Sequence, residues 1–233
     1  MFDLTSVPAG TPNEWAQAAN IAMARLQARK VSQISYEVPT QLGFCCRWIA
    51  IYTQAHIRRG LSLLASGIDE IGRGRTLAAA LCARALLEDA ALLFTFNRDV
   101  LPLLDQRDVE GLDRLIIPRA LATRNQREIE RHGEEVRARN ILTAIDKMAR
   151  EHPNVRPVYD ELSEVCHPNS LGVLWHFSEI TGEGDVAFDD GQRMRDPALH
   201  HLIFCGLVFA TEEVAIERIE RLIETILGEE AAG

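Results

Sequence analysis

Arg84 and Glu88 lie four residues apart within one of the most apolar stretches of this chain, LAAALCARALLEDAALLFTF. On a helix, this spacing places both side chains on one face. A charged side chain in such a stretch must be paired or must face a cavity, because an unpaired and desolvated charge costs several kcal/mol. The two residues are therefore either an ion pair that ties helices together or the polar floor of a binding pocket.

A second polar row is found in YDELSEVCHPNS, where Tyr159, Ser163 and His167 recur every four residues. This spacing predicts that they share one face of a helix over residues 154–167. Pro168 disfavours helical geometry at the residue before it, so the helix should end at His167. A helix carboxyl end favours a protonated imidazole. The segment is either a polar helix stop or one side of a pocket.

We expect the two groups to face each other and to form a single site. Arg84 and Glu88 would be its floor, because one carboxylate cannot satisfy all five donors of a guanidinium group. Its wall would be formed by the hydroxyl, imidazole and amide side chains of Tyr159, Ser163, His167 and Asn169.

The pairing of Arg-Ala-Leu-Leu-Glu (84–88) with Tyr-x-x-Leu-Ser-Glu-x-x-His-Pro (159–168) resembles bacterial helical families that are grouped with the HEPN-like superfamily. The resemblance spans residues 40–225 and implies that the two segments face each other inside a helical bundle. This superfamily includes metal-independent ribonucleases of toxin–antitoxin and phage-defence systems, and also non-catalytic binding members.

The nuclease members of that superfamily carry Arg-x(4–6)-His, and the chain contains this pattern at Arg195–His200 and at Arg127–His132. In a nuclease, Arg195 would stabilise charge on the scissile phosphate and His200 would act as general acid or base. A chain rich in arginine, with seven histidines, also produces such matches by chance. Asp196 and Pro197 have an alternative role as the N-cap and first residue of a helix.

Cysteine and histidine spacing predicts neither a metal site nor a cofactor. None of the five cysteines is in a C-x-x-C pair, which favours reduced, buried thiols. Four histidines have no partner at metal-ligand spacing and are interpreted as structural: His56, His152, His176 and His201.

Two further segments could contact an anion. Gly72-Arg73-Gly74-Arg75-Thr76 precedes a helix, but it lacks the glycine spacing and the lysine of a P-loop, which favours a hinge. Residues 114–139 hold seven arginines against four glutamates. This stretch is either a solvated helical surface or a contact for RNA or an acidic partner.

Periodicity and capping signals predict one all-α domain, a multi-helix bundle over residues 1–233. Residues 1–10 are expected to be disordered or extended, and residues 171–191 to form a short hairpin or an ordered loop. The first predicted helix starts at the capping box Thr11-Pro12-Asn13-Glu14 and buries Trp15, Ala18, Ala22 and Leu26. The second runs after Pro39 to about Ser66 with Gly67 as its terminator, the third covers 76–96, and the fourth follows Asp108 and should be kinked or split by Pro118. The remaining helices are predicted over 134–151, over 154–167 and from Asp196 onward.

The last helix places Ile216, Ile219, Ile223 and Ile226 at alternating three- and four-residue steps. This seam is typical of intramolecular core more often than of a dimer contact. Together with the apolar second helix, it still leads us to expect a homodimer.

Charge and the amino terminus indicate a cytosolic protein. The net charge of −9 argues against broad binding to nucleic acid or to an anionic membrane. The beginning MFDLTSVPAG lacks the pattern of a signal peptide, and the apolar stretch 77–96 contains three charges.

Two function classes follow. The favoured one is a non-enzymatic helical module that binds a small ligand or a partner through the buried polar cluster. The alternative is a HEPN-like metal-independent ribonuclease. Under either class, the expected partners of the protein are a second copy of the chain and a small ligand, RNA or an antitoxin-like protein. No binding to a membrane is expected.

Overall fold

The computed structural model describes residues 1–34, 40–182 and 184–232. The chain is 76% helical, and its sheet in these ranges is a single two-stranded hairpin. The all-α prediction is therefore confirmed.

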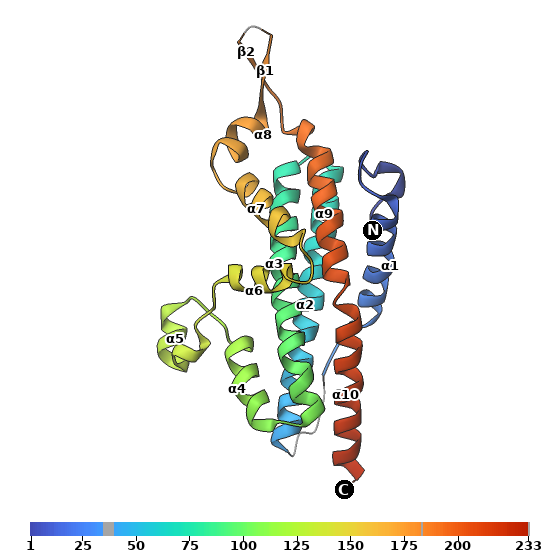
Figure 1. Ribbon diagram of the computed structural model, residues 1–233, viewed down its shortest axis with the longest axis vertical. Helices are drawn as coiled ribbons and strands as arrows, with labels where there is room; N and C mark the ends of the chain where they lie inside the picture. The colour runs from blue at the N-terminus through green and yellow to red at the C-terminus, as the bar shows by residue number, and fades with distance from the viewer. Residues whose placement is uncertain (35–39, 183, 233) are drawn as a thin grey trace.

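The elements follow one another with short connections (Figure 1). The helices are α1 (Asn13–Ala28), α2 (Gln41–Gly72), α3 (Thr76–Gln106), α4 (Val109–Ala120), α5 (Gln126–His132), α6 (Ile141–Ala149), α7 (Val155–Cys166), α8 (Trp175–Phe177), α9 (Arg195–Ala210) and α10 (Glu213–Ala232). Shorter turns are η1 (Leu4–Ser6), η2 (Glu134–Val136), the π-helical η3 (Ser170–Leu174) and η4 (Gln192–Met194), and the strands are β1 (Ser178–Thr181) and β2 (Asp185–Phe188).

Helix α3 is central, as its apolar sequence predicts. It packs against α2 along its length, against α9, and against α6 and α7. The core has two parts: α1, α6, α7 and α9 cover the first half of α3, and α4 and α10 cover its second half with the start of α2. Figure 1 shows α2, α3, α9 and α10 along the long axis, with α4, α5 and α6 to one side.

Two helix ends differ from the prediction. α2 continues to Gly72, and Gly67 is buried within it instead of ending it. A Cβ atom at Gly67 would lie 2.7 Å from Leu202 Cδ1, so the glycine lets α9 approach α2 closely. The N-cap of α1 is Pro12, whereas the predicted cap, Thr11, uses its hydroxyl to contact Nδ1 of His200 at 2.7 Å.

Docking on α9 also rotates α1 relative to the predicted inner face. Ala18 is exposed and Ala22 only half-buried, and the residues that are buried are Ala16, Ala19, Met23 and Leu26. The prediction was right for Leu26 alone among the buried positions.

The last predicted helix is two helices, separated at Thr211 and Glu212. The side chain of Glu212 is buried at this break, where one of its oxygens accepts a hydrogen bond from Asn97 Nδ2 at 2.7 Å. The isoleucine seam on α10 is buried within the chain itself, so the intramolecular interpretation is confirmed.

Three further segments complete the comparison. The helix predicted over 134–151 is interrupted: Asn140 begins α6 anew by accepting a hydrogen bond from the Leu142 amide. The amino terminus is not disordered, because Phe2 is buried in the core and exchanges hydrogen bonds with Asn20. The predicted hairpin over 171–191 is present, with Ser178 paired to Phe188.

Segment Gln192–Ala232 is long and apolar enough by composition to cross a membrane. However, 61% of its most apolar window is buried inside the bundle, as expected for a core helix. The apolar residues of this segment therefore pack in the core of the bundle.

A candidate anion-binding cavity

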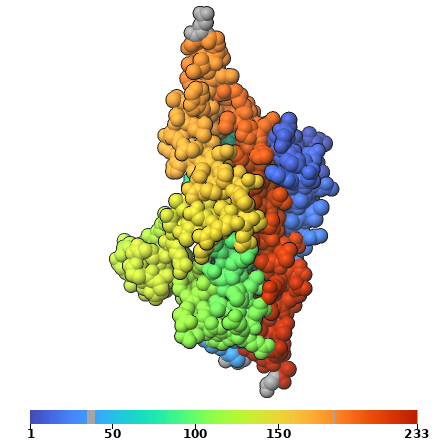
Figure 2. Space-filling model, in the orientation of Figure 1, coloured from blue at the N-terminus to red at the C-terminus, as the bar shows by residue number. Residues whose placement is uncertain are grey.

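A cavity of about 890 Å³ lies between α2, α3, α4 and α6. The segment between α4 and α6 forms one of its walls. That segment stands out from the body of the molecule in Figure 2, at the side that carries α5. The volume is within the range of small-molecule sites in proteins.

The lining is strongly basic. Among the described residues, three carboxylates line the cavity, Glu88, Asp89 and Glu135, against eight cationic side chains. The cations are Arg59, Arg84, Arg114, Arg119, Arg124, Arg137, Arg139 and Lys147. This excess of positive charge occurs on a chain whose net charge is −9, so it is a local feature of the cavity.

The fold gathers these arginines from the basic stretch 114–139. After α4 the chain leaves the bundle and returns, and two backbone hydrogen bonds close this excursion: Thr123 N to Val136 O and Ala138 N to Thr123 O, both 2.8 Å. The closure holds Arg124, Arg137 and Arg139 at one wall. Five of the seven arginines in the stretch therefore surround one cavity.

Some of the cations that line the cavity are paired with a carboxylate, and others are not. Arg119 is held by Asp99 at 2.7 Å and Thr95 at 3.3 Å, and Arg137 by Glu134 at 2.6 Å. In the part of the chain that the structure describes, Arg124, Arg139 and Lys147 form no ion pair, so they are the groups most available to an anion.

A buried histidine–aspartate pair forms another part of the lining. His56 Nδ1 lies 2.9 Å from Oδ1 of Asp89, and Arg59 Nε lies 3.3 Å from the same oxygen. The Tyr52 ring lies 4.3 Å from the His56 ring, centroid to centroid. Burial raises the pKa of Tyr52 to about 12, so its hydroxyl stays neutral.

Three polar atoms of lining residues are enclosed without a hydrogen-bond partner among the described residues: Asp89 Oδ2, Arg84 Nε and Arg119 Nε. Buried polar atoms in proteins are normally satisfied. A bound ligand or a water molecule in the cavity would satisfy them.

The structure brings together three residues of the site predicted from sequence. Tyr159 Oη lies 3.4 Å from Arg84 Nη2 and donates to Glu88 Oε1 at 3.2 Å, while Arg84 Nε lies 3.3 Å from Glu88 Oε1. Ser163 follows on the same helix, and its hydroxyl is buried without a hydrogen-bond partner in the described chain. Burial raises the pKa of Cys166, which Arg84 opposes.

His167 and Asn169 are corrections to that prediction. His167 is exposed and ends α7, so it does not point into a pocket. Asn169 accepts a hydrogen bond from the Gly172 amide and donates to Glu164, which are the contacts of a polar helix stop.

The arginine and the histidine suggested by the nuclease pattern contact different partners. Arg195 is the first residue of α9 and contacts Asp196 at 3.3 Å, so Asp196 is not the N-cap. His200 faces α1, where it contacts Thr11 and lies 6.1 Å from the Trp15 ring, and burial lowers its pKa. Neither Arg195 nor His200 is among the described residues that line the cavity.

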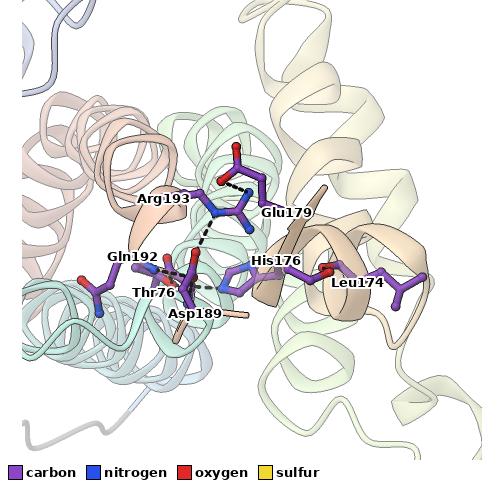
Figure 3. Close-up of polar contacts among 9 residues, drawn as sticks. Thr76, Leu174, His176, Glu179, Asp189, Gln192 and Arg193 are labelled. Atoms are coloured by element: carbon purple, nitrogen blue, oxygen red, sulfur yellow. Dashed lines mark hydrogen bonds and ion pairs between the residues drawn. The ribbon is translucent and has the colours of Figure 1, made fainter. Parts of the chain in front are cut away.

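His176 holds the hairpin to the start of α3 (Figure 3). Its Nε2 lies 3.0 Å from the hydroxyl of Thr76, which donates to Gly191 O at 3.0 Å. Because the single hydroxyl proton of Thr76 goes to Gly191 O, Nε2 of His176 donates to Thr76, and burial lowers the pKa of His176. This position agrees with a structural role.

The glycine–arginine segment 72–76 is adjacent to the same junction. Arg73 contacts Asp69 at 2.7 Å and Arg75 contacts Glu70 at 2.7 Å, so both arginines are neutralised nearby. This arrangement favours the hinge interpretation over phosphate binding.

Within the described residues there is no group of three metal-ligating side chains, and all five cysteines are free. Sequence reasoning missed His56 and Asp89 as a pair, because they lie on different helices. The available signal was Asp89 itself, a carboxylate within the apolar stretch 77–96.

Comparisons of the chain with protein-family models, with curated proteins and with solved structures found no match.

Proposed function

We propose that the protein binds a small phosphorylated ligand in the cavity between α2, α3, α4 and α6. This is the binding-module class that the sequence favours. The observation that carries the proposal is the excess of eight cations over three carboxylates around the cavity of an acidic protein. Phosphate groups are recognised by arginine through charge-assisted, often bidentate hydrogen bonds.

The shape and chemistry of the wall narrow the class of ligand. Leu92, Leu115 and Pro118 also line the cavity, with Ile141 and Ala144 contributing from α6, so apolar side chains are interspersed with its cations. An apolar or aromatic body joined to a phosphate would use both kinds of side chain. A molecule the size of a mononucleotide fits this description.

The predicted HEPN-like relationship is part of the proposal, supported by the contact of Arg84 and Glu88 with Tyr159. The ribonuclease alternative has less support, because the Arg195 and His200 side chains have separate partners. RNA and an antitoxin-like protein therefore rank below a small ligand as partners.

A homodimer and a cytosolic location are also proposed. The isoleucine seam is covered within the chain, but the hairpin exposes Ile180, Val186 and Phe188, which supports a second copy as partner. Light scattering that shows only a 26.0 kDa species at micromolar concentration would remove the dimer.

The binding proposal is tested by titration calorimetry at low ionic strength, with inorganic pyrophosphate and AMP as probes. Arg139→Glu/Lys147→Glu reverses two unpaired cavity charges and should weaken binding roughly 100-fold, since each reversal costs on the order of 1 kcal/mol or more. The matched control is Arg131→Glu/Arg150→Glu, which reverses two exposed arginines outside the cavity. Equal binding by both double variants, or no binding by the natural chain, would refute the proposal.

A further inference from the structure

His56 and Asp89 form a pair whose proton position is determined by chemistry. Nδ1 of His56 lies 2.9 Å from Oδ1 of Asp89, whose side chain is fully buried. An ionised carboxylate only accepts hydrogen bonds, so Nδ1 carries the proton. In the neutral imidazole, the lone pair is then on Nε2.

The free nitrogen of this imidazole is accessible from the cavity. His56 is one of the lining residues, and Nε2 is not among the enclosed polar atoms of the described chain. No described side chain or backbone group contacts Nε2 within hydrogen-bond distance. A water molecule held in the cavity can therefore reach it.

Two cations from different helices line the cavity together with the pair. Arg59 Nε lies 3.3 Å from Asp89 Oδ1, and Arg119 is fixed by Asp99 and Thr95 with its own Nε left without a partner. Guanidinium groups placed in this way would stabilise negative charge on the non-bridging oxygens of a phosphate. The combination of an oriented base and fixed cations is the arrangement that hydrolysis of an anionic ester needs.

We propose that this cavity hydrolyses a phosphate ester, with His56 as general base and Asp89 as the residue that positions it. The proposal rests on the phosphate-binding function proposed above. Water gives a proton to Nε2 of His56 while its oxygen bonds to phosphorus. The bond from phosphorus to the ester oxygen breaks, and the imidazolium returns the proton to that oxygen. The products are an alcohol and a phosphate that carries one ester group fewer, and water is the only co-reactant.

The chain supplies a matched control for the pair. His201 Nε2 lies 2.9 Å from Glu161 Oε2, the same separation as in the His56–Asp89 pair. The Glu161 side chain is 65% exposed, whereas that of Asp89 is 0% exposed. Neither His201 nor Glu161 is among the described residues of the cavity lining. If the environment of the pair decides activity, His201 should contribute nothing.

The test follows the release of 4-nitrophenolate by the full-length protein from bis(4-nitrophenyl) phosphate, a diester, and from 4-nitrophenyl phosphate, a monoester. Turnover of either probe is expected, and the probe that reacts identifies the ester class. His201→Asn should keep the full rate. His56→Asn and His56→Gln should each lower kcat roughly 100-fold or more, the range of general acid–base catalysis. Asp89→Asn should lower kcat and leave KM unchanged, while the number of pyrophosphate sites per chain, which loss of folding would reduce, stays that of the natural chain.

Calorimetric binding of pyrophosphate separates the two proposals. The His56 variants should still bind it, because the cations remain, and binding also shows that they are folded. A natural chain that binds pyrophosphate but hydrolyses neither ester would overturn the hydrolytic proposal and leave the binding proposal standing. So would a His56→Gln variant that binds and is as active as the natural chain. If the natural chain does not bind pyrophosphate, the proposed function itself is wrong.

Discussion

Arginine has opposite roles at two places beside the α2–α3 core. Arg29, at the end of α1, lies near three carboxylates of α10: Glu220 at 2.5 Å, Glu217 at 3.1 Å and Glu213 at 3.9 Å. In this group, called the Arg29 cluster below, acidic groups outnumber the cation. Around the cavity the ratio is reversed, and cations outnumber carboxylates.

The difference shows which charges belong to the fold and which are available to a ligand. The Arg29 cluster joins α1 to α10, and its cation is neutralised by carboxylates of the chain itself. The cavity keeps cations close together without enough carboxylates to neutralise them, a cost in folding stability that a bound anion would relieve. Sites that bind ligands often reduce stability in this way.

The largest effect is expected when the Arg29 cluster loses its cation. Arg29→Met should lower the free energy of unfolding by about 3 kcal/mol, because three carboxylates would lose the cation that they share. Arg25→Met is the control: its side chain is 66% exposed against 22% for Arg29, and it contacts one carboxylate at 3.6 Å. Urea unfolding should show a loss below about 1 kcal/mol for the control. Equal losses would mean that the cluster is not structural.

A smaller effect, here a gain in the free energy of unfolding, is expected on replacing Glu212, the buried carboxyl where α9 meets α10. Burial raises its pKa from 4.5 to about 7, against a lowering by the hydrogen bond from Asn97. The folded chain therefore holds this proton more tightly than the unfolded chain does. The stabilisation is complete below the unfolded pKa and is lost as the pH rises through the folded one.

Glu212→Gln keeps the side chain neutral at every pH. It should exceed the natural chain in unfolding free energy by about 2 kcal/mol at about pH 9, with the difference vanishing under acidic conditions. Urea titrations at the two pH values measure this. The exposed Glu224→Gln should show no such pH dependence, and a Glu212→Gln chain less stable than the natural one in base would contradict the account.

Removing one hydrogen-bonding group from the polar contact between α3 and α7 should lower the free energy of unfolding by about 1 kcal/mol. Tyr159→Phe removes a hydroxyl that contacts both Arg84 and Glu88. Ser163→Ala, on the same helix, removes a hydroxyl with no partner among the described residues and should cost almost nothing. Thermal unfolding of the two variants side by side tests the difference, and a Ser163→Ala loss as large as that of Tyr159→Phe would show an unrecognised contact.

The smallest effect on stability is expected in the cavity, which makes the contrast with Arg29 sharpest. Arg139→Met/Lys147→Met removes two cations that form no ion pair in the described chain. The free energy of unfolding should change by less than about 0.5 kcal/mol, or rise. A loss comparable to that of Arg29→Met, measured in the same urea titration, would show that these cations are structural.

Local signals in the sequence predicted much of the fold. Asp108 caps α4 as expected, by accepting a hydrogen bond from the Gly111 amide, and α7 begins and ends within one residue of the predicted bounds. These features depend on side chains within one turn of each other. The rotation of α1, the packing role of Gly67 and the break at Glu212 depend on neighbouring helices, so the periodicity of one segment does not contain them.

The candidate site was predictable in the same partial way. Four-residue spacing correctly placed Tyr159 and Ser163 in one row, but it could not show where neighbouring helices stop covering that row. Exposure therefore rises from buried Tyr159 to half-buried Ser163 and exposed His167. His56 and Asp89 lie 33 residues apart and meet only because α2 packs on α3.

The most direct test of the cavity is to locate a bound oxyanion. Crystals of the natural chain grown or soaked with tungstate, a tetrahedral dianion like phosphate, would show its position by anomalous scattering. We expect tungstate inside the cavity, within hydrogen-bond distance of Arg119 and beside Arg139 or Lys147. Tungstate found only at exposed arginines outside the cavity, such as Arg131 or Arg150, would contradict the central claim that this cavity is an anion site.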